Sequence, residues 1–219
     1  VVEAVRITPD IEKHIEACVP LAPLHNPAAL EGVRAARCLF VGVPQVGVFD
    51  TAFHQTLPAR AFLYALPRAL YAEQGIRRYG FHGTSHRYVA MRAGELLGVA
   101  LERLSVITCH LGNGVSLAAV AGGRSVDTTM GLTPLEGIPM GTRSGDIDPA
   151  LVFHLMREGK TLDEVEHMLQ NESGLLGLSG RSQDVRELET AATDGDEVAA
   201  EALEVFAYRV RKAIGSYCA

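Results

Sequence analysis

The chain has 219 residues, of which 47% are hydrophobic and 21% charged, and its formal net charge is −6. This length fits one large domain or two small ones, with the composition of a soluble globular protein. Lys and Arg are scattered, and no run of eighteen apolar residues occurs, which argues against nucleic-acid binding and against a membrane-spanning helix. The first residues show no secretory signal, and we expect a cytoplasmic protein with four buried free thiols: Cys18, Cys38, Cys109 and Cys218.

The first half of the chain is predicted to be mainly helical, with two short strands. Apolar spacing, caps and glycine or proline breaks set the expected boundaries. In chain order, we predict helices over residues 11–18 and 26–39, a buried strand over 45–49 that ends at Asp50, a helix over 60–71, a strand over 78–81, and a helix over 85–97 that ends at Gly98.

The second half is predicted to begin as a sheet. Apolar strands over residues 104–109 and 115–120 are joined by a turn over residues 112–114, and a second turn follows at Gly122-Gly123. Glycine and proline exclude a regular element from residues 131–147, which we expect to form an ordered loop.

Helices are predicted after this loop, the first with Asp148 as its cap and Pro149 as its first residue. The pattern Thr161-x-x-Glu164 predicts a capping box for the next helix. From Asp196 onward, apolar residues follow one helical face to the end of the sequence, so we expect both ends to be cut from a longer protein. Strands that alternate with helices indicate an α/β fold.

Asp50 is the first candidate for chemistry, because ligands of α/β sheets bind where strands end. A carboxylate there suits a metal ion or a reacting group, and it equally suits capping of the next turn. His82 and His86 have a spacing that could bind zinc from one helix face. Because Gly83-Thr84-Ser85 predicts a cap between them, we expect His82 to precede the helix, where it could donate to an anion, and His86 to be a surface or core residue.

Three further segments place polar groups on turns or loops. The turn from His110 to Gly114 could bring backbone amides close to phosphate oxygens, although Gly-Asn-Gly is also an ordinary hairpin turn. Arg143 stands on the 131–147 loop, where a planar guanidinium suits phosphate or carboxylate, or is solvated at the surface. The run Asp184-Val185-Arg186 is typical of the capped first turn of a surface helix.

Five motifs in this order resemble the acetate kinase family. The resemblance covers almost the whole chain and is weakest over the first twenty residues. The motifs are Leu21-Ala22-Pro23-Leu24-His25-Asn26-Pro27, Val48-Phe49-Asp50-Thr51-Ala52-Phe53-His54-Gln55-Thr56, Tyr79-Gly80-Phe81-His82-Gly83-Thr84-Ser85-His86, Cys109-His110-Leu111-Gly112-Asn113-Gly114, and Met130-Gly131-Leu132-Thr133-Pro134-Leu135-Glu136-Gly137 leading into Met140-Gly141-Thr142-Arg143.

This resemblance implies part of an actin-like, ribonuclease-H-like two-domain ATPase fold of the α/β class. Residues 1–51 would end the first domain, and residues 52–219 would form the larger part of the second. The implied reaction is the reversible transfer of the γ-phosphoryl group of ATP to the carboxylate of acetate, giving ADP and acetyl phosphate. The resemblance further implies Mg²⁺ as cofactor and a homodimer.

Particular residues receive roles from the same resemblance. Asp50 would orient the acceptor or help to hold Mg²⁺, and Arg143 and His82 would stabilise the transferring phosphoryl group. The nucleotide phosphates would be held by His110, Leu111, Gly112, Asn113 and Gly114. Further contacts to the nucleotide would come from Asp184, Val185 and Arg186. The pocket for the acyl group would be formed by Leu24, Phe81 and Pro134, with His25 nearby.

Alternatives remain at this point. Propionate and butyrate kinases share the motifs, and one methylene in an apolar pocket discriminates by only about 1–3 kcal/mol. A metal-dependent hydrolase would use Asp50, His82, His86 and His110, and a non-catalytic fragment would serve only as an interaction or dimerisation module. The resemblance also implies an upstream arginine and a downstream adenosine loop, so the segment alone is expected to have little or no kinase activity.

Overall fold

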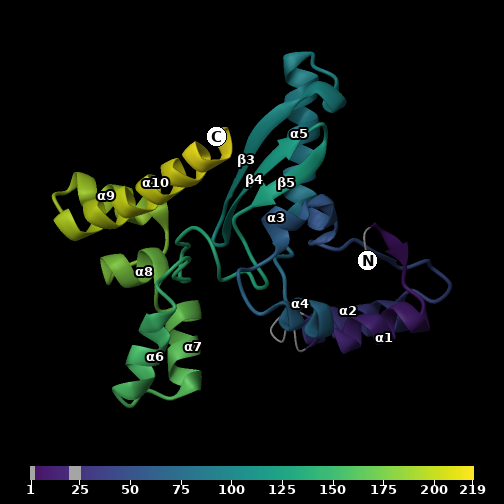
Figure 1. Cartoon of the computed structure of the whole chain (residues 1–219), viewed down its shortest axis with the longest axis horizontal. Helices are drawn as coiled ribbons and strands as arrows, with labels where there is room; N and C mark the ends of the chain where they lie inside the picture. Colours follow the sequence, from purple (N-terminus) through teal and green to yellow (C-terminus); the bar gives the residue numbers. More distant parts are fainter. Residues whose placement is uncertain (1–2, 20–25) are drawn as a thin grey trace.

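The computed structural model describes residues 3–19 and 26–219 (Figure 1). Near the N-terminus, α1 (Pro9–Ala17) and α2 (Asn26–Leu39) lie side by side. Glu12 of α1 accepts hydrogen bonds at 2.7 and 2.6 Å from Arg34 and Arg37 of α2. The two helices predicted in this part of the sequence are therefore confirmed.

The buried strand predicted over residues 45–49 is wrong in length and in burial. β2 (Val46–Gly47) pairs antiparallel with β1 (Val5–Arg6), and each strand has two residues. Val46 and Val48 are 62% and 65% exposed, because no second layer of the described chain covers them. An apolar run indicates what a strand can bury, but not whether a neighbouring element covers it.

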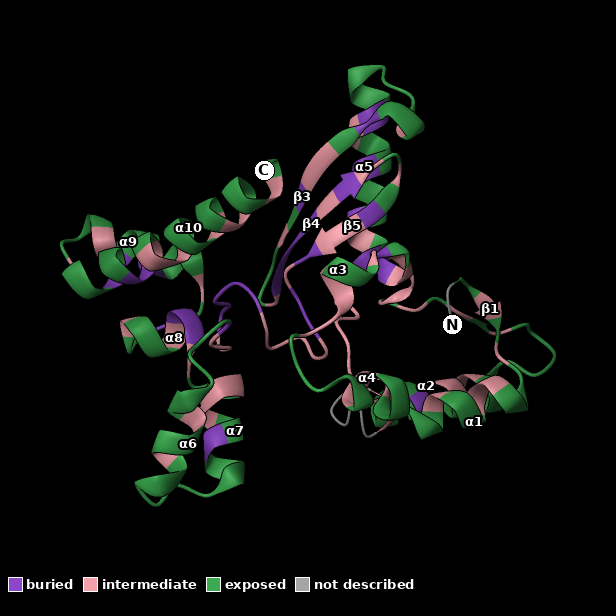
Figure 2. Cartoon of the chain, in the orientation of Figure 1, coloured by how far each residue is buried: buried purple, intermediate pink, exposed green. Residues whose placement is uncertain are grey.

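An antiparallel sheet of three strands occupies the centre of the structure. Its strands are β3 (Ser105–Leu111), β4 (Val115–Ala121) and β5 (Arg124–Thr128), in the spatial order β3-β4-β5. The two predicted strands and the two predicted turns are confirmed. Buried residues concentrate in this sheet and in the loop that follows it, whereas the outer helices are mostly exposed (Figure 2).

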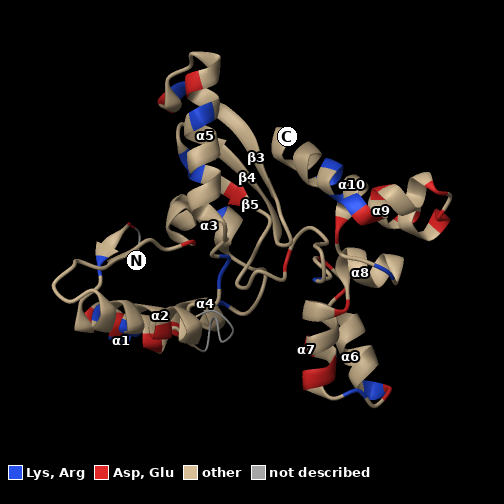
Figure 3. Cartoon of the chain, turned by 180° about the vertical axis from the view of Figure 1, so that it is seen from behind, with Lys and Arg blue, Asp and Glu red and all other residues tan. Residues whose placement is uncertain are grey.

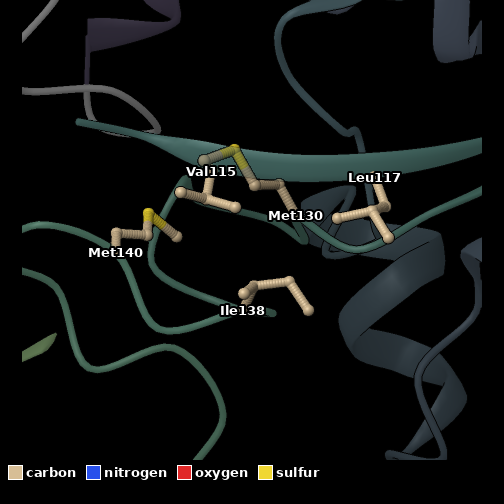
Figure 4. Packing of buried hydrophobic residues seen from close by; sticks show 5 residues of the cluster. All are labelled: Val115, Leu117, Met130, Ile138 and Met140. Carbon is tan, nitrogen blue, oxygen red and sulfur yellow. The ribbon is translucent and has the colours of Figure 1, made fainter. Parts of the chain in front are cut away.

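The central strand β4 is buried on both faces, because successive side chains of a strand point to opposite sides. On one face, Ala118 and Val120 pack with Ala90 of α5 (Gly83–Leu97). The other face joins a core cluster against which α10 (Glu197–Cys218) packs. That cluster contains Val115, Leu117, Met130, Ile138 and Met140 (Figure 4).

Two predictions between β2 and α5 are wrong. The single helix expected over residues 60–71 is two helices, α3 (Ala59–Phe62) and α4 (Arg68–Gln74), because Pro67 precedes the second and cannot donate to a continuing helix. The 3-10 helix η2 (Ala52–Thr56) precedes them. Residues 78–81 form no strand: the amides of Tyr79 and Gly80 donate to the carbonyl of Gly131 in an irregular segment.

The C-terminal part is helical, as predicted. After the 3-10 helix η3 (Leu101–Arg103) and the sheet, the helices are α6 (Ala150–Arg157), α7 (Leu162–Asn171), α8 (Gly174–Ser179), α9 (Val185–Thr193) and α10. Asp148 accepts a hydrogen bond from the amide of Ala150, the capping box of Thr161 and Glu164 is complete, and Asp196 caps α10. The predicted starts of these helices are thus confirmed to within one residue.

The predicted burial of the cysteines is wrong: all four are exposed and none is in a disulfide. Apolar neighbours in sequence misled the prediction, since Cys109, for example, lies on β3, an edge strand. Lys and Arg are spread over several helices rather than gathered on one (Figure 3). Within the described residues, no helix combines the length and hydrophobicity required to cross a membrane.

Candidate active site

Asp50 lies against the N-terminus of α5. Its Oδ2 accepts a hydrogen bond of 2.8 Å from the amide of His82, and its carbonyl accepts one of 2.9 Å from the amide of Gly83. A side chain at Gly83 would collide with the Asp50 carbonyl, so this approach requires glycine. A carboxylate is stabilised at this end of a helix, where amides without helical partners carry partial positive charge.

His82 is the N-cap of α5, so it precedes the helix as predicted. The cap expected at Gly83-Thr84-Ser85 is wrong, because these residues already belong to the helix. His82 has φ of 57° and is the one non-glycine residue with positive φ among those described. Such a conformation costs free energy and persists only where the surroundings hold it. Here the Asp50 carboxylate holds the His82 amide.

The ring of His82 is held from two sides. Its Nδ1 is 2.8 Å from Oγ of Ser116, and the ring stacks on His110 with centroids 3.9 Å apart. Burial, aided by the nearby His110 ring, lowers the pKa of His82 to about 4 against the opposing effect of Asp50. His82 is therefore a neutral imidazole at pH 7.

His86 is a core histidine, one of the two placements expected for it. It is 1% exposed, and its Nδ1 and Nε2 lie 2.7 Å from Oγ1 of Thr108 and Oγ of Ser116. Burial lowers its pKa to about 3, with smaller contributions from His54, His82 and His110. Because both ring nitrogens have hydroxyl partners, His86 has no lone pair directed at a shared metal ion.

The turn from His110 to Gly114 joins β3 to β4 as a hairpin, so the hairpin interpretation of its sequence is confirmed. The turn also borders the loop that carries Arg143, since the amide of Gly141 donates to the carbonyl of Asn113 at 3.0 Å. A methyl group on Gly114 would lie 3.2 Å from Nε2 of His82 and 3.5 Å from Nη1 of Arg143. His82, Gly114 and Arg143 therefore meet around one small space.

Arg143 lies on the irregular loop predicted over residues 131–147, which the structure confirms as a loop. Its Nη1 donates to the carbonyl of Pro134 at 3.1 Å and lies 3.6 Å from Sδ of Met140. Within residues 3–19 and 26–219, no carboxylate forms an ion pair with it. Burial lowers the pKa of this guanidinium, which still stays protonated at neutral pH. A half-buried cation with only neutral partners is suited to an anionic ligand.

The remaining predicted site residues that the structure describes are not among those that meet around the space between His82, Gly114 and Arg143. Phe81 packs against the core cluster of Figure 4, and Pro134 contacts Arg143 through its carbonyl. Leu24 and His25 lie outside the described residues. Leu111 and Gly112 belong to the β3–β4 hairpin and are exposed.

Asp184 caps α9 and forms an ion pair with Arg186, whose guanidinium lowers the pKa of Asp184 to about 2. The capped first turn predicted for Asp184-Val185-Arg186 is confirmed. The neighbouring Gln183 lies against Gly141, so this turn borders the Arg143 loop, although no hydrogen bond joins Asp184 or Arg186 to Arg143.

Sequence reasoning missed the polar residues that support the site. Ser116 is fully buried between His82 and His86, and its signal was a lone polar residue in the apolar strand from Val115 to Val120. Glu136 is the second omission. It accepts hydrogen bonds from Arg78 and Tyr64, while Arg78 also donates to the carbonyls of residues 128–130. These bonds fix the loop that carries Pro134.

Zn²⁺ and Mg²⁺ require different sets of protein ligands. Among residues 3–19 and 26–219, no three His, Cys, Asp or Glu side chains gather as a ligand set, so the hydrolase alternative finds no zinc site there. Mg²⁺ needs only one or two carboxylates when phosphates and waters complete its shell. Oδ1 of Asp50 accepts no hydrogen bond from the described chain, so the donor set fits Mg²⁺.

A half-buried guanidinium, a neutral imidazole and a glycine turn meet around one space, an arrangement that suits an anionic ligand. The sequence model of the acetokinase family matches residues 1–219. The chain belongs to the acetokinase family.

Relatives of known identity agree with this assignment. The chain is 59% identical to the acetate kinase of Geobacillus kaustophilus over 218 residues and 57% identical to that of Staphylococcus carnosus; each match covers 99% of this chain and 55% of the relative. The chain thus spans about half the length of the curated relatives it matches.

Two solved structures are similarly close. The acetate kinase of Porphyromonas gingivalis matches with a TM-score of 0.94 and 49% identity, covering 99% of this chain and 54% of that one. A propionate kinase from Francisella tularensis matches with a TM-score of 0.96 and 47% identity, covering 99% and 56%. The expected α/β fold is confirmed as part of the fold of these kinases.

Proposed function

We propose that this chain carries part of the site that transfers the γ-phosphoryl group of ATP to acetate. In this reaction an acetate oxygen attacks the γ-phosphorus, the bond from that phosphorus to the β–γ bridging oxygen breaks, and ADP and acetyl phosphate form. No general base is required, because acetate is already ionised at neutral pH. What supports the proposal most directly is the meeting of His82, Gly114 and Arg143 around one space.

The chemistry requires groups that offset negative charge, because two anions react with each other. Arg143 supplies a fixed positive charge, and Nε2 of His82 supplies a donor to the same phosphoryl oxygens. The amides of the hairpin from His110 to Gly114 would hold the nucleotide phosphates. Asp184, Val185 and Arg186 would contact the nucleotide from the turn that borders the Arg143 loop.

Asp50 would hold Mg²⁺ through Oδ1 while Oδ2 keeps its bond to the His82 amide. When bound, the metal ion would neutralise charge on the β- and γ-phosphate oxygens. This arrangement ties the carboxylate to the same helix N-terminus that positions His82. A change at Asp50 is therefore expected to affect His82 as well.

Phe81 and Pro134, with Leu24 and His25, would form the pocket for the acyl group. Acetate is the proposed acceptor, and propionate is the second candidate because a propionate kinase is among the similar solved structures. We also propose the division into residues 1–51 and 52–219 as parts of two domains, a homodimeric enzyme, and a cytoplasmic location.

The test is formation of acyl phosphate from Mg-ATP, trapped with hydroxylamine, in parallel with calorimetric titration of Mg²⁺ and a non-hydrolysable ATP analogue that keeps the γ-phosphate position. Acetate, propionate and butyrate are compared, and Arg143→Ala is compared with Arg157→Ala, an exposed arginine on α6. We expect nucleotide binding that Arg143→Ala weakens and Arg157→Ala preserves. Product favouring acetate would identify the acceptor. If the chain neither binds nucleotide nor forms product, the proposal is rejected in favour of a non-catalytic module.

A further inference from the structure

Four buried or half-buried side chains form a continuous line of hydrogen bonds that ends at His82. Oγ1 of Thr108 is 2.7 Å from Nδ1 of His86, and Nε2 of His86 is 2.7 Å from Oγ of Ser116. The same Oγ is 2.8 Å from Nδ1 of His82. Thr108, His86 and Ser116 are 4%, 1% and 0% exposed, so bulk water does not compete for these bonds.

Ser116 couples the two histidine rings because its hydroxyl has one proton and contacts two ring nitrogens. If the proton goes to Nδ1 of His82, then Nε2 of His86 must be the donor to Ser116. If it goes to Nε2 of His86, then Nδ1 of His82 must be the donor. The two rings cannot choose their protonated nitrogens independently.

The geometry at Thr108 favours one of these directions. Its hydroxyl is 2.7 Å from Nδ1 of His86 but 3.4 Å from the carbonyl of Ala118, the other acceptor in reach. The shorter contact is the stronger one, and with the hydroxyl as its donor both imidazoles keep their proton at Nε2, the nitrogen that a neutral histidine prefers to protonate in water. His86 then accepts at Nδ1 and donates from Nε2 to Ser116, and Ser116 donates to Nδ1 of His82. The low pKa values of both rings agree with two neutral imidazoles.

We propose that Ser116 and His86 are positioning residues that fix His82 in the tautomer protonated at Nε2. This nitrogen is the one beside Gly114 and Arg143. The inference rests on the proposed function, because a phosphoryl group in that space needs a donor from His82. The other tautomer would direct a lone pair at the phosphoryl oxygens and repel them.

The tautomer can be measured directly in the chain labelled with ¹⁵N-histidine. Two-bond proton–nitrogen correlations identify the protonated ring nitrogen, and the His82→Gln variant assigns the His82 signals. We expect His82 of the native chain to carry its proton at Nε2. In Ser116→Ala the ratio of the two tautomers should shift about tenfold toward Nδ1, which corresponds to about 1.4 kcal/mol.

Ser125→Ala is the matched control. Ser125 is also fully buried and places its Oγ 2.8 Å from Nδ1 of another histidine, His54, but it is outside the line to His82. This control should leave the His82 tautomer unchanged. Ser116→Cys keeps the shape of the side chain with a somewhat larger atom and a weak donor, and it should shift the tautomer in the same direction even where the alanine variant fails to fold.

A native His82 protonated at Nδ1 would overturn the proposal, as would an unchanged tautomer in both Ser116 variants or an equal shift in Ser125→Ala. These spectra need no nucleotide, so they are independent of whether the chain transfers a phosphoryl group. Where product is formed, Ser116→Ala should lower kcat more than it raises KM for ATP. An increase in KM alone would contradict a role in orienting His82 toward the reacting group.

Discussion

Acidification from pH 7 to pH 5 is expected to destabilise the fold through its buried histidines. His86 is 1% exposed and His54 is fully buried, and burial is the main cause that lowers the pKa of each. In the unfolded chain an imidazole has a pKa of about 6.5. The unfolded state therefore binds more protons in this window, and the free energy of unfolding falls as the pH falls.

The magnitude follows from the pKa of about 3 for folded His86. Between pH 6.5 and pH 5 the unfolded imidazole gains a proton that the folded one does not, over about 1.5 pH units at about 1.4 kcal/mol each. His86 thus accounts for a loss of about 2 kcal/mol, and His54 acts in the same direction. Ending at pH 5 keeps ordinary carboxylates ionised, so they contribute little to the change.

Urea unfolding at pH 7, 6 and 5 measures this loss, followed by circular dichroism because the chain has no tryptophan. The variant His86→Gln should reduce the pH dependence by about 2 kcal/mol, whereas His154→Gln, at an exposed histidine of α6, should not. The reasoning fails if the native chain is equally stable at pH 7 and pH 5, or if His86→Gln retains the native pH dependence.

Four other predictions concern packing, caps and the site. Leu117→Ala empties a fully buried position of β4 and should lower the free energy of unfolding by about 2–5 kcal/mol in urea titrations; a loss below that of a surface substitution would contradict the packing. Thr161→Ala removes the cap of α7 and should lower the free energy of unfolding by about 1 kcal/mol in the same assay. An unchanged free energy of unfolding would show that water replaces the hydroxyl and would contradict the prediction. Glu136→Gln removes the charged partner of Arg78 and should speed amide exchange in the loop near Pro134, while unchanged exchange would show that the ion pair does not fix the loop. Where the native chain forms acyl phosphate, Arg143→Ala should reduce its formation by about 10²–10³-fold in the hydroxylamine assay, and activity within about twofold of native would remove Arg143 from the proposed mechanism.

The sequence predicted well those features that depend on neighbouring residues. The capping box at Thr161 and the hairpin turn before Val115 are local devices, and both occur where the pattern indicated them. The glycine and proline residues around Arg143 likewise indicated an irregular loop. In each case the residues that set the conformation are within a few positions of one another.

Features set by distant parts of the chain were predicted poorly. The sequence around Val46 predicts a buried strand, but the burial of a strand depends on which elements cover it. The helix predicted over residues 60–71 was wrong because Pro67, a helix breaker, lies within that apolar stretch. The support of His82 by Ser116 joins residues 34 positions apart. No local pattern shows that a serine of one strand will face a histidine before a helix, so this contact could not be predicted from the sequence.

Burial acts differently on His82 and Arg143, which meet beside Gly114, and this difference would account for the separate roles proposed for them. A half-buried imidazole loses its charge readily, and the pKa of His82 falls to about 4. A guanidinium in a similar position keeps its proton, because its pKa starts far above neutrality. Between pH 5 and pH 8 the pair therefore carries one positive charge, on Arg143, and His82 contributes a hydrogen bond whose direction depends on its tautomer. Histidine at position 143 would not replace arginine, because the same desolvation would neutralise it.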